Sequence, residues 1–271
     1  MTDKPAPVTK PVVVKPPFGI PVLWGRRGMG KTLASLNSPF QPVHVIDVEN
    51  SSEDYDMHQD RLIELGFIKQ HFTRVPTLTW ESFMAEYDRI TGRFTGPDRK
   101  TAYKHSDVRY GTIVLDTAGQ IATWVATNVF GAASEAQAEK MGQVMWGKVR
   151  DTLRNMLLHL QSQCDLVVLT AHEREWKGVY TPRLNPSVLE LTSLSLQLMR
   201  QPNQQIPDAN VVYARLPFFP PRIPQFTLAK LMTYIQKPAN WKELAEDEKI
   251  VEEKPVVTTP PSIEEQALDE G

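Results

Sequence analysis

Cysteines and long apolar runs are scarce in this sequence. It has one cysteine among 271 residues, Cys164, which excludes a disulfide framework and a cysteine-rich metal centre. No uninterrupted apolar run approaches the ~20 residues that span a bilayer, and the opening MTDKPAPVTKP lacks the apolar core of a signal peptide. We therefore expect a cytoplasmic protein without a membrane partner, with Cys164 in its core.

An excess of one charge is also lacking, because 30 basic and 32 acidic residues leave a net charge of −2. The distribution is uneven: residues 241–271 hold ten acidic and three basic side chains, whereas residues 1–240 hold 22 acidic and 27 basic ones. Residues 1–17 contain five prolines, and both ends have compositions typical of disorder. The sequence predicts a folded domain over residues 18–240, between a proline-rich tail (1–17) and an acidic tail (241–271).

Short apolar runs alternate with longer amphipathic stretches along this domain. The runs predict strands over residues 20–24, 43–48, 111–117, 165–170 and 210–216. The stretches predict helices over residues 52–66, 80–91 and 141–163. In the last helix, apolar side chains recur every three or four residues at Met141, Val144, Met145, Val149, Leu153, Met156, Leu157 and Leu160. Unbroken apolar centres in two strands indicate burial on both faces, which favours an α/β fold with a mostly parallel sheet.

The segment GRRGMGKT, residues 25–32, fits the P-loop pattern G-x-x-x-x-G-K-[ST]. A predicted strand precedes it and a short helix follows, which is the context that the pattern requires. The glycines let backbone N–H groups face phosphates, Lys31 would reach the β- and γ-phosphates, and Thr32 would offer its hydroxyl to Mg²⁺. We therefore expect ATP and Mg²⁺ as cofactors. The predicted phosphate-binding residues are Gly25, Arg26, Arg27, Gly28, Met29, Gly30, Lys31, Thr32 and Leu33.

Hydrolysis needs a carboxylate for magnesium and a group that orients water. Asp116 ends the predicted strand in YGTIVLDTAG, the place for an aspartate that holds Mg²⁺ together with Thr32. The alternative is an ordinary aspartate at the start of a turn. Residue 117 is threonine, so the adjacent Asp-Glu pair of many AAA+ and packaging ATPases is absent. The general base must then come from elsewhere.

The segment VHVIDVENSSED supplies a candidate base. Here the sequence resembles the RecA family, in which the strand after the P-loop helix ends in an acidic-x-Glu element whose glutamate activates water. Asp47 and Glu49 match that element, and Asp116-Thr117 matches the Asp-Ser/Thr that ends the RecA magnesium strand. The resemblance implies that Glu49 is the general base. A solvated acidic loop that caps the next helix is the alternative.

The segment DLVVLTAHERE places His172 just after the next predicted strand. In RecA-like ATPases a polar residue here senses the γ-phosphate, and compact phage relatives carry Thr-x-His. The resemblance implies that His172 joins Lys31 and Glu49 as a catalytic residue. An ordinary surface or core histidine is the alternative.

Two segments, residues 118–142 and 173–188, occupy the positions of the DNA loops of RecA-like proteins. The second mixes cations, which suit phosphates, with aromatic rings, which stack on bases. Its candidate DNA-binding residues are Arg174, Trp176, Lys177, Tyr180 and Arg183. A structured loop whose aromatic side chains pack on the domain is an equal alternative. The basic stretch 92–111 is predicted to be a solvated connector.

The resemblance covers residues 19–215 and is closest to small phage and prophage RecA-like ATPases of single-strand annealing and recombination. It implies an ATPase that acts on single-stranded DNA in phage-type recombination or replication, in the cytoplasm of a bacterial host. A small-molecule kinase or switch, or an assembly or packaging ATPase acting on protein, are the alternatives.

Two questions about partners stay open at this point. The first is whether the protein forms a homo-oligomer. A RecA-style filament is not expected, because the amino-terminal module that links RecA subunits is not recognisable. The acidic tail is the other. It is predicted either to compete weakly with DNA or to dock a single-strand-binding or replication protein.

Overall fold

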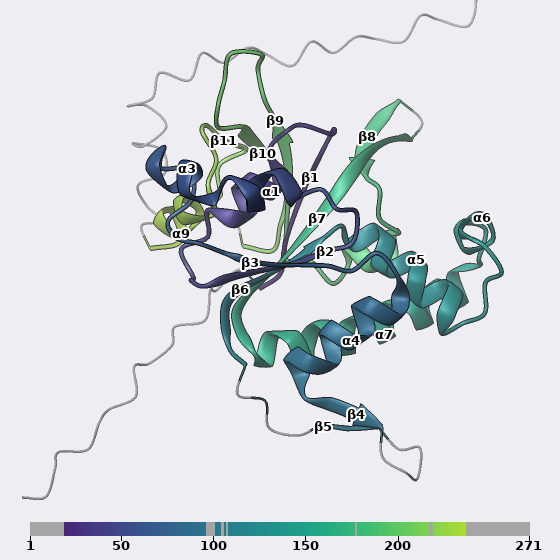
Figure 1. Ribbon diagram of the computed structural model, residues 1–271. Coiled ribbons are helices and arrows are strands. Elements are labelled where there is room, and N and C mark those ends of the chain that lie inside the picture. The colour runs from purple at the N-terminus through teal and green to yellow at the C-terminus, as the bar shows by residue number, and fades with distance from the viewer. Residues whose placement is uncertain are drawn as a thin grey trace, which may run out of the picture.

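The computed structural model describes residues 19–95, 101–103, 106, 108–176, 178–216 and 219–236. Within these residues, nine strands form one sheet in the order β11-β10-β9-β1-β7-β6-β2-β3, and β8 pairs with β7 beside that path (Figure 1). The strands are β1 (Pro21–Gly25), β2 (Val43–Asp47), β3 (Thr73–Pro76), β6 (Tyr110–Asp116), β7 (Cys164–Trp176), β8 (Val179–Pro182), β9 (Leu194–Met199), β10 (Asp208–Ala214) and β11 (Arg222–Ile223). A separate hairpin joins β4 (Arg93–Thr95) to β5 (Thr101–Tyr103).

The centre of the sheet is parallel. Strand β1 pairs in parallel with β7 and β9, and the parallel pairing continues from β7 through β6 and β2 to β3. Strands β8, β10 and β11 are antiparallel to their neighbours. The predicted α/β fold with a mostly parallel sheet is confirmed. Because parallel strands end at one edge, the loops that follow β1, β2, β6 and β7 meet there.

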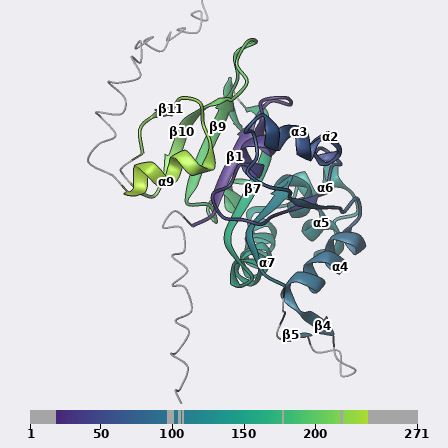
Figure 2. The ribbon, with the colours of Figure 1, turned by 60° about the vertical axis from the view of Figure 1, so that its left-hand side comes forward.

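Helices cover both faces of this sheet (Figure 2). One apolar core lies under α4, α5 and α7, and the other lies under α1 and α9. The helices are α1 (Lys31–Leu36), α2 (Glu53–Met57), α3 (Gln59–Glu64), α4 (Trp80–Thr91), α5 (Ala118–Asn128), α6 (Glu135–Glu139), α7 (Gln143–Ser162), α8 (Pro186–Leu189) and α9 (Leu228–Gln236).

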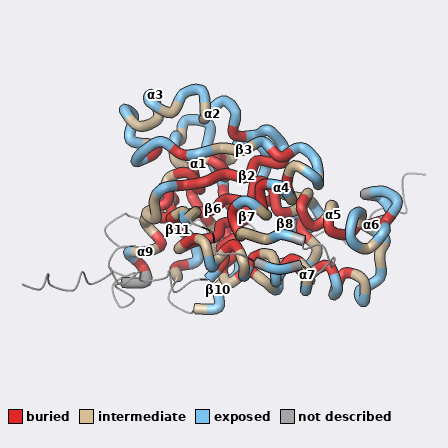
Figure 3. The backbone as a smooth tube through the Cα atoms, turned by 60° about the horizontal axis from the view of Figure 1, so that its bottom comes forward, coloured by how far each residue is buried: buried red, intermediate tan, exposed pale blue. Residues whose placement is uncertain are grey.

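Strand residues alternate between the two cores. In β1, Val22 and Trp24 join the core under α7, whereas Leu23 joins the core under α9. In β6, Leu115 joins the core under α7, and Val114 joins the core under α9. Both faces are therefore apolar, which explains the unbroken apolar runs of the sequence. Figure 3 shows the buried strands at the centre of the molecule.

The predicted helix 80–91 is confirmed as α4, whereas the predicted helix 52–66 is divided into α2 and α3. The other predicted helix and the predicted strands are found with shifted ends, and β3 and β9 are among the elements that were not predicted. The prediction of a DNA loop over 118–142 is wrong in its first half, because α5 forms there and buries Ile121 and Val125. In α7 the predicted apolar stripe is wrong at Val144, which is 78% exposed.

Three further expectations concern the core, the membrane and the tails. Cys164 is buried, as expected, and burial raises the pKa of its thiol to about 12. In the part of the chain that the structure describes, no helix is both long and apolar enough to cross a membrane. The predicted tails, 1–17 and 241–271, lie outside the described residues.

Candidate nucleotide site

The candidate residues gather at the carboxyl edge of the parallel strands. Gly25, the last residue of β1, lies beside His172 of β7, and Asp47, the last residue of β2, lies beside Asp116 of β6. The sheet therefore brings together residues that are far apart in the sequence.

The P-loop connects β1 to α1, and two glycines show why this segment needs them. Gly30 caps α1 with a φ of 83°, in the left-handed region that favours glycine. A Cβ atom on Gly25 would lie 2.7 Å from the backbone oxygen of Leu198, so a larger residue would push β1 away from β9. Arg27 and Gly28 are exposed, whereas Met29 and Leu33 pack partly against the core under α9.

Lys31 lies folded back onto this loop. Its Nζ donates to the backbone oxygens of Gly25 at 3.1 Å and Arg26 at 3.0 Å, and the residue is buried. Burial lowers the pKa of the Lys31 ammonium, and the carboxylates of Asp116 and Glu49 oppose that shift. Because its hydrogen-bond partners among the described residues are carbonyl oxygens, this ammonium is suited to exchange them for an anion.

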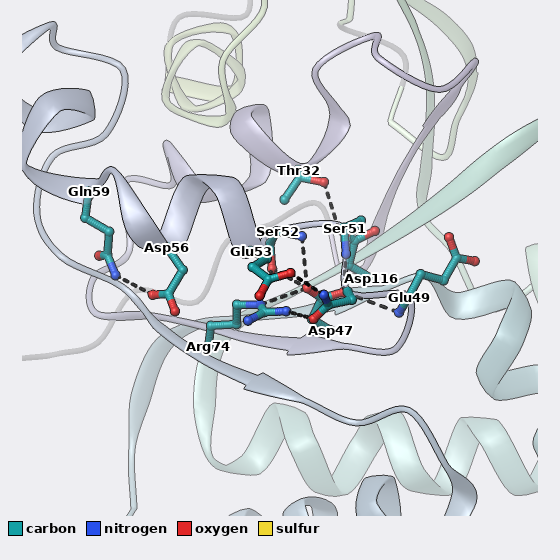
Figure 4. Close-up of polar contacts among 11 residues, drawn as sticks. Thr32, Asp47, Glu49, Ser51, Ser52, Glu53, Asp56, Gln59, Arg74 and Asp116 are labelled. Atoms are coloured by element: carbon teal, nitrogen blue, oxygen red, sulfur yellow. Dashed lines mark hydrogen bonds and ion pairs between the residues drawn. The ribbon is translucent and has the colours of Figure 1, made fainter.

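Asp116 lies opposite the P-loop at the end of β6 (Figure 4). Its Oδ2 accepts hydrogen bonds from Thr32 Oγ1 and Ser51 Oγ, each at 2.8 Å, and its Oδ1 accepts one from Thr170. Mg²⁺ prefers oxygen ligands and binds through one or two protein groups together with substrate phosphates. The hydroxyl of Thr32 and the carboxylate of Asp116 fit that ion.

Glu49 follows β2 and reaches across to β7. Its Oε1 accepts a hydrogen bond from Thr117 Oγ1 at 2.8 Å, and its Oε2 accepts one from His172 Nε2 at 2.6 Å. The hydrogen bond from His172 is the main reason that the pKa of the Glu49 carboxyl lies below its usual value, and burial opposes it. The carboxylate is one-third exposed, so it is ionised, oriented and open to water.

Asp47, the partner of Glu49 in the acidic-x-Glu element, has a different surrounding. Its fully buried carboxylate accepts hydrogen bonds from the backbone N–H groups of Ser51 and Ser52, the Ser52 hydroxyl and Arg74 Nε (Figure 4). Burial raises the pKa of Asp47, but these donors outweigh it and the pKa is lowered. Asp47 therefore anchors the loop that presents Glu49 and Ser51.

The sequence predicts His172 just after a strand, but the residue lies within β7. The strand runs on to Trp176 and turns back through β8, because Glu173 and Arg174 pair with Pro182 and Thr181. The predicted loop over 173–188 is therefore mostly a β-hairpin, followed by α8.

The β7–β8 hairpin contacts the P-loop directly. Arg26 Nε donates to Glu173 Oε1 at 3.0 Å, and the Arg26 guanidinium lies 5.2 Å from the centre of the Tyr180 ring. Glu173 also accepts a hydrogen bond from Gln197 at 3.1 Å. No local pattern in the sequence marks this connection, because it depends on the pairing of β1, β7 and β9.

The other candidate DNA-binding residues have mixed surroundings. Arg174 is half-buried and donates to the backbone oxygen of Leu184 at 3.4 Å. Arg183 has an exposed side chain, and its backbone N–H donates to His172 O at 2.6 Å. Trp176 ends β7, and Lys177 lies outside the described residues.

The fold and the P-loop together define an α/β P-loop NTPase domain. A family model described as an AAA domain matches residues 21–194, and the chain belongs to this AAA domain family. No curated protein sequence matches the chain. The family indicates a nucleotide-binding ATPase domain, of which Mg²⁺ is the usual partner ion. The chain matches this family although Thr117 stands where many AAA+ proteins have the glutamate of an adjacent Asp-Glu pair.

Proposed function

We propose that this protein binds Mg-ATP at the P-loop and hydrolyses it, with Glu49 as the general base. The observation that carries this proposal is the convergence of Lys31, Thr32, Asp116 and Glu49 at one edge of the sheet, joined by hydrogen bonds of Thr32 with Asp116 and of Glu49 with His172. A cation that binds the phosphates, a site for magnesium and a base that positions the attacking water are parts that recur in phosphoryl transfer to water.

Each of these residues has a distinct task in the proposed reaction. Lys31 would leave the carbonyl oxygens of Gly25 and Arg26 and bind the β- and γ-phosphates. Thr32 and Asp116 would hold Mg²⁺, which neutralises developing charge on the phosphates when bound. Glu49 would orient a water molecule and take its proton. His172 and Thr117 keep the Glu49 carboxylate in one orientation.

The experiment is phosphate release by the full chain and by Lys31→Ala. Removing the ammonium takes away a charge that stabilises the transferring phosphoryl group, so turnover should fall to background. Lys148→Ala, an exposed lysine on α7, is the matched control and should keep wild-type turnover. Unchanged turnover of Lys31→Ala would reject the P-loop assignment.

For the molecule on which the ATPase acts, we propose single-stranded DNA, bound at the β7–β8 hairpin. The hairpin carries Arg174, Tyr180 and Arg183, and it contacts the P-loop through Arg26. A partner on the hairpin would therefore be connected to the nucleotide site. The further assignment to phage-type recombination or replication rests on the resemblance to small RecA-like ATPases.

Phosphate release with and without single-stranded DNA tests this second part. We expect a faster rate with DNA, because the hairpin holds both Arg26 and, through His172, Glu49. Equal rates together with absent DNA binding would reject a DNA partner. Transfer of the phosphoryl group to a small molecule instead of water would favour the kinase alternative.

A further inference from the structure

The loop that joins β9 to β10, residues 200–207, lies beside the P-loop. Because β9 pairs in parallel with β1, both strands end at the same edge of the sheet (Figure 1). Pro207 is buried, and a Cβ atom on Gly30 would lie 3.4 Å from two atoms of its ring. Ile206 and Leu33 of α1 line the same small cavity. The loop therefore packs against the beginning of the helix that follows the P-loop.

The position of Glu49 determines the direction in which a nucleotide would lie. Hydrolysis requires the γ-phosphate to face Glu49, which is hydrogen-bonded to His172 of β7. Strand β7 lies on one side of β1, and β9 lies on the other. With its terminal phosphate toward β7, a nucleotide at the P-loop would extend its sugar and base toward β9 and the loop that follows it.

Tyr55 lies within electrostatic range of both ends of this path. Burial raises the pKa of the Tyr55 hydroxyl, the charge of Arg200 opposes that rise, and the charge of Asp116 adds to it. Arg200 is the first residue of the loop, and Asp116 belongs to the candidate magnesium site. The loop and the site for the phosphates therefore lie near the same side chain.

The loop lines a cavity of about 720 Å³, which we call the β9–β10 cavity. Its volume is in the range of sites that hold a small organic molecule. Ile206 gives it an apolar wall. The other lining residues, apart from Asp208, carry side-chain amides: Gln201, Asn203, Gln204, Gln205 and Gln225.

The polar groups of this cavity differ in whether they are already hydrogen-bonded. Asp208, the one carboxylate among the described lining residues, accepts hydrogen bonds from Arg222, Gln204 and the backbone N–H of Gln225. The side-chain amides of Gln201 and Gln205 are exposed and have no hydrogen-bond partner in the part of the chain that the structure describes. The groups left for a ligand are therefore amides.

Amides of this kind suit a nucleobase, and adenine in particular. A glutamine amide presents a donor and an acceptor side by side, and it pairs in this way with the amino group and a ring nitrogen of adenine. Guanine presents two neighbouring donors, N1–H and the 2-amino group, for which a free carboxylate is the better partner. The carboxylate of Asp208 is not free.

We propose that the β9–β10 cavity holds the adenine base of the bound nucleotide, with Gln201 and Gln205 as the residues that hydrogen-bond to it. The inference rests on the proposed function, because it concerns the same nucleotide. It goes beyond that function by assigning the choice of base to the β9–β10 loop, outside the P-loop and the acidic residues.

The test measures the binding of three magnesium complexes to the full chain by calorimetry: ATP, GTP and inorganic tripolyphosphate, which has phosphates without a base. The wild type should bind ATP more tightly than GTP. Gln201→Ala and Gln205→Ala should each bind ATP about two- to tenfold more weakly, as expected for the loss of a neutral hydrogen bond. Both should bind tripolyphosphate as the wild type does, because the P-loop is unchanged. Gln143→Ala, an exposed glutamine on α7, is the matched control.

Gln205→Glu tests the choice of base directly. A carboxylate accepts hydrogen bonds from the two donors of guanine but has no proton to donate to adenine. The ratio of GTP affinity to ATP affinity should therefore rise by about fivefold or more, the lower end of the discrimination that paired hydrogen bonds give. The ratio of kcat/KM for the two nucleotides should rise with it. Gln143→Glu makes the same charge change elsewhere and should leave both ratios unchanged.

The outcomes separate this inference from the proposed function. If the wild type binds and hydrolyses Mg-ATP and the loop variants keep its affinities and its GTP-to-ATP ratio, the base lies elsewhere and the inference is wrong. An equal loss of ATP and tripolyphosphate affinity in the alanine variants would also overturn it, because the loop would then act on the phosphates or the fold. A wild type that binds neither ATP nor tripolyphosphate would overturn the proposed function, and this inference with it.

Discussion

Two histidine–glutamate pairs lie at opposite ends of β2, and they have the same chemistry in different surroundings. His44, near the start of the strand, lies 2.7 Å from Glu86 of α4, measured from Nε2 to Oε1. His172 lies 2.6 Å from Glu49, which follows the end of the strand. Comparing the two shows what distinguishes a structural pair from one that can do chemistry.

The pair at the start of β2 is buried and fully occupied. His44 also shares a hydrogen bond with Thr73 at 2.6 Å and stacks on Tyr110 with ring centres 4.3 Å apart. Glu86 accepts two hydrogen bonds from Arg89. Burial opposes its ionisation, but the hydrogen bonds from Arg89 and His44 lower the pKa of Glu86 to about 2. The polar atoms of this pair are thus hydrogen-bonded to one another and to their neighbours, and the His44–Glu86 contact joins α4 to the sheet.

The pair beyond the end of β2 is open to solvent on both members. The side chains of His172 and Glu49 are each about one-third exposed, and a separate cavity beside them leaves room for another group. Lys31, whose charge acts on Glu49, is held by backbone oxygens. This pair keeps a carboxylate oriented but accessible, which is the requirement for a general base. The role of such a pair therefore depends on its exposure and neighbours.

The largest expected effect is that of Glu49→Gln. If Glu49 accepts a proton from water, the variant should bind Mg-ATP normally and lose about 10²-fold or more in turnover. Single-turnover kinetics and a fluorescent ATP analogue separate these quantities. Glu53→Gln, an exposed acid in the following helix, is the control. Wild-type hydrolysis by Glu49→Gln would instead indicate that Glu49 belongs to a solvated acidic loop without a catalytic role.

Glu86→Gln should lower the stability of the fold, whereas Glu49→Gln lowers turnover. The amide keeps the shape of the carboxylate but loses charge-assisted hydrogen bonds, each worth about 1.5–3 kcal/mol. We expect the free energy of unfolding in urea to fall by about 2 kcal/mol. Asp88→Asn, also on α4, breaks the more exposed pair with Arg93 of β4 and should change stability by less than about 1 kcal/mol. Equal effects of the two variants would contradict the buried role of Glu86.

The pH dependence of stability sharpens the same contrast. The pKa of Glu86 falls from 4.5 to about 2 on folding, so between these values the unfolded chain binds more protons and stability rises with pH. The contribution of Glu86 is fully present above about pH 4.5 and is lost as the pH falls through 2. Urea unfolding between pH 6 and pH 3 should therefore show a shallower decline for Glu86→Gln than for the wild type. If the free energy of unfolding falls equally steeply with pH in both proteins, other carboxyl groups account for the acid sensitivity.

Local patterns in the sequence were enough to predict much of this site. The P-loop, Asp116 and Glu49 each lie within a few residues of an apolar strand, and parallel strands bring such ends to one edge. The α/β class follows from the same strands, whose apolar runs reflect burial on two faces. The catalytic roles of these residues remain predictions.

Contacts that depend on register between distant strands were not predictable. Arg26 and Glu173 are 147 residues apart, and nothing local marks them as partners. Helix α5 was missed for a different reason: the small residues in its sequence, among them Gly119, Ala122 and Ala126, are also typical of loops. Asp47 and Glu49 are neighbours in the sequence, but the anchoring role of Asp47 depends on Arg74, which lies in the unpredicted strand β3.

The smallest expected effect belongs to Arg26→Ala, at the contact between P-loop and hairpin. Arg26 is 64% exposed, so solvent and salt screen its pairing with Glu173 and its removal should leave the melting temperature unchanged. The β7–β8 hairpin should nevertheless lose a restraint, because Arg26 also contacts Tyr180 on the returning strand. Hydrogen exchange of the amides in residues 173–182 should then become faster in the nucleotide-free variant. Arg27→Ala, the neighbouring exposed arginine, is the matched control and should leave exchange unchanged. Identical exchange in both variants would show that the hairpin is held by its own strand pairing alone, and that the P-loop does not restrain it.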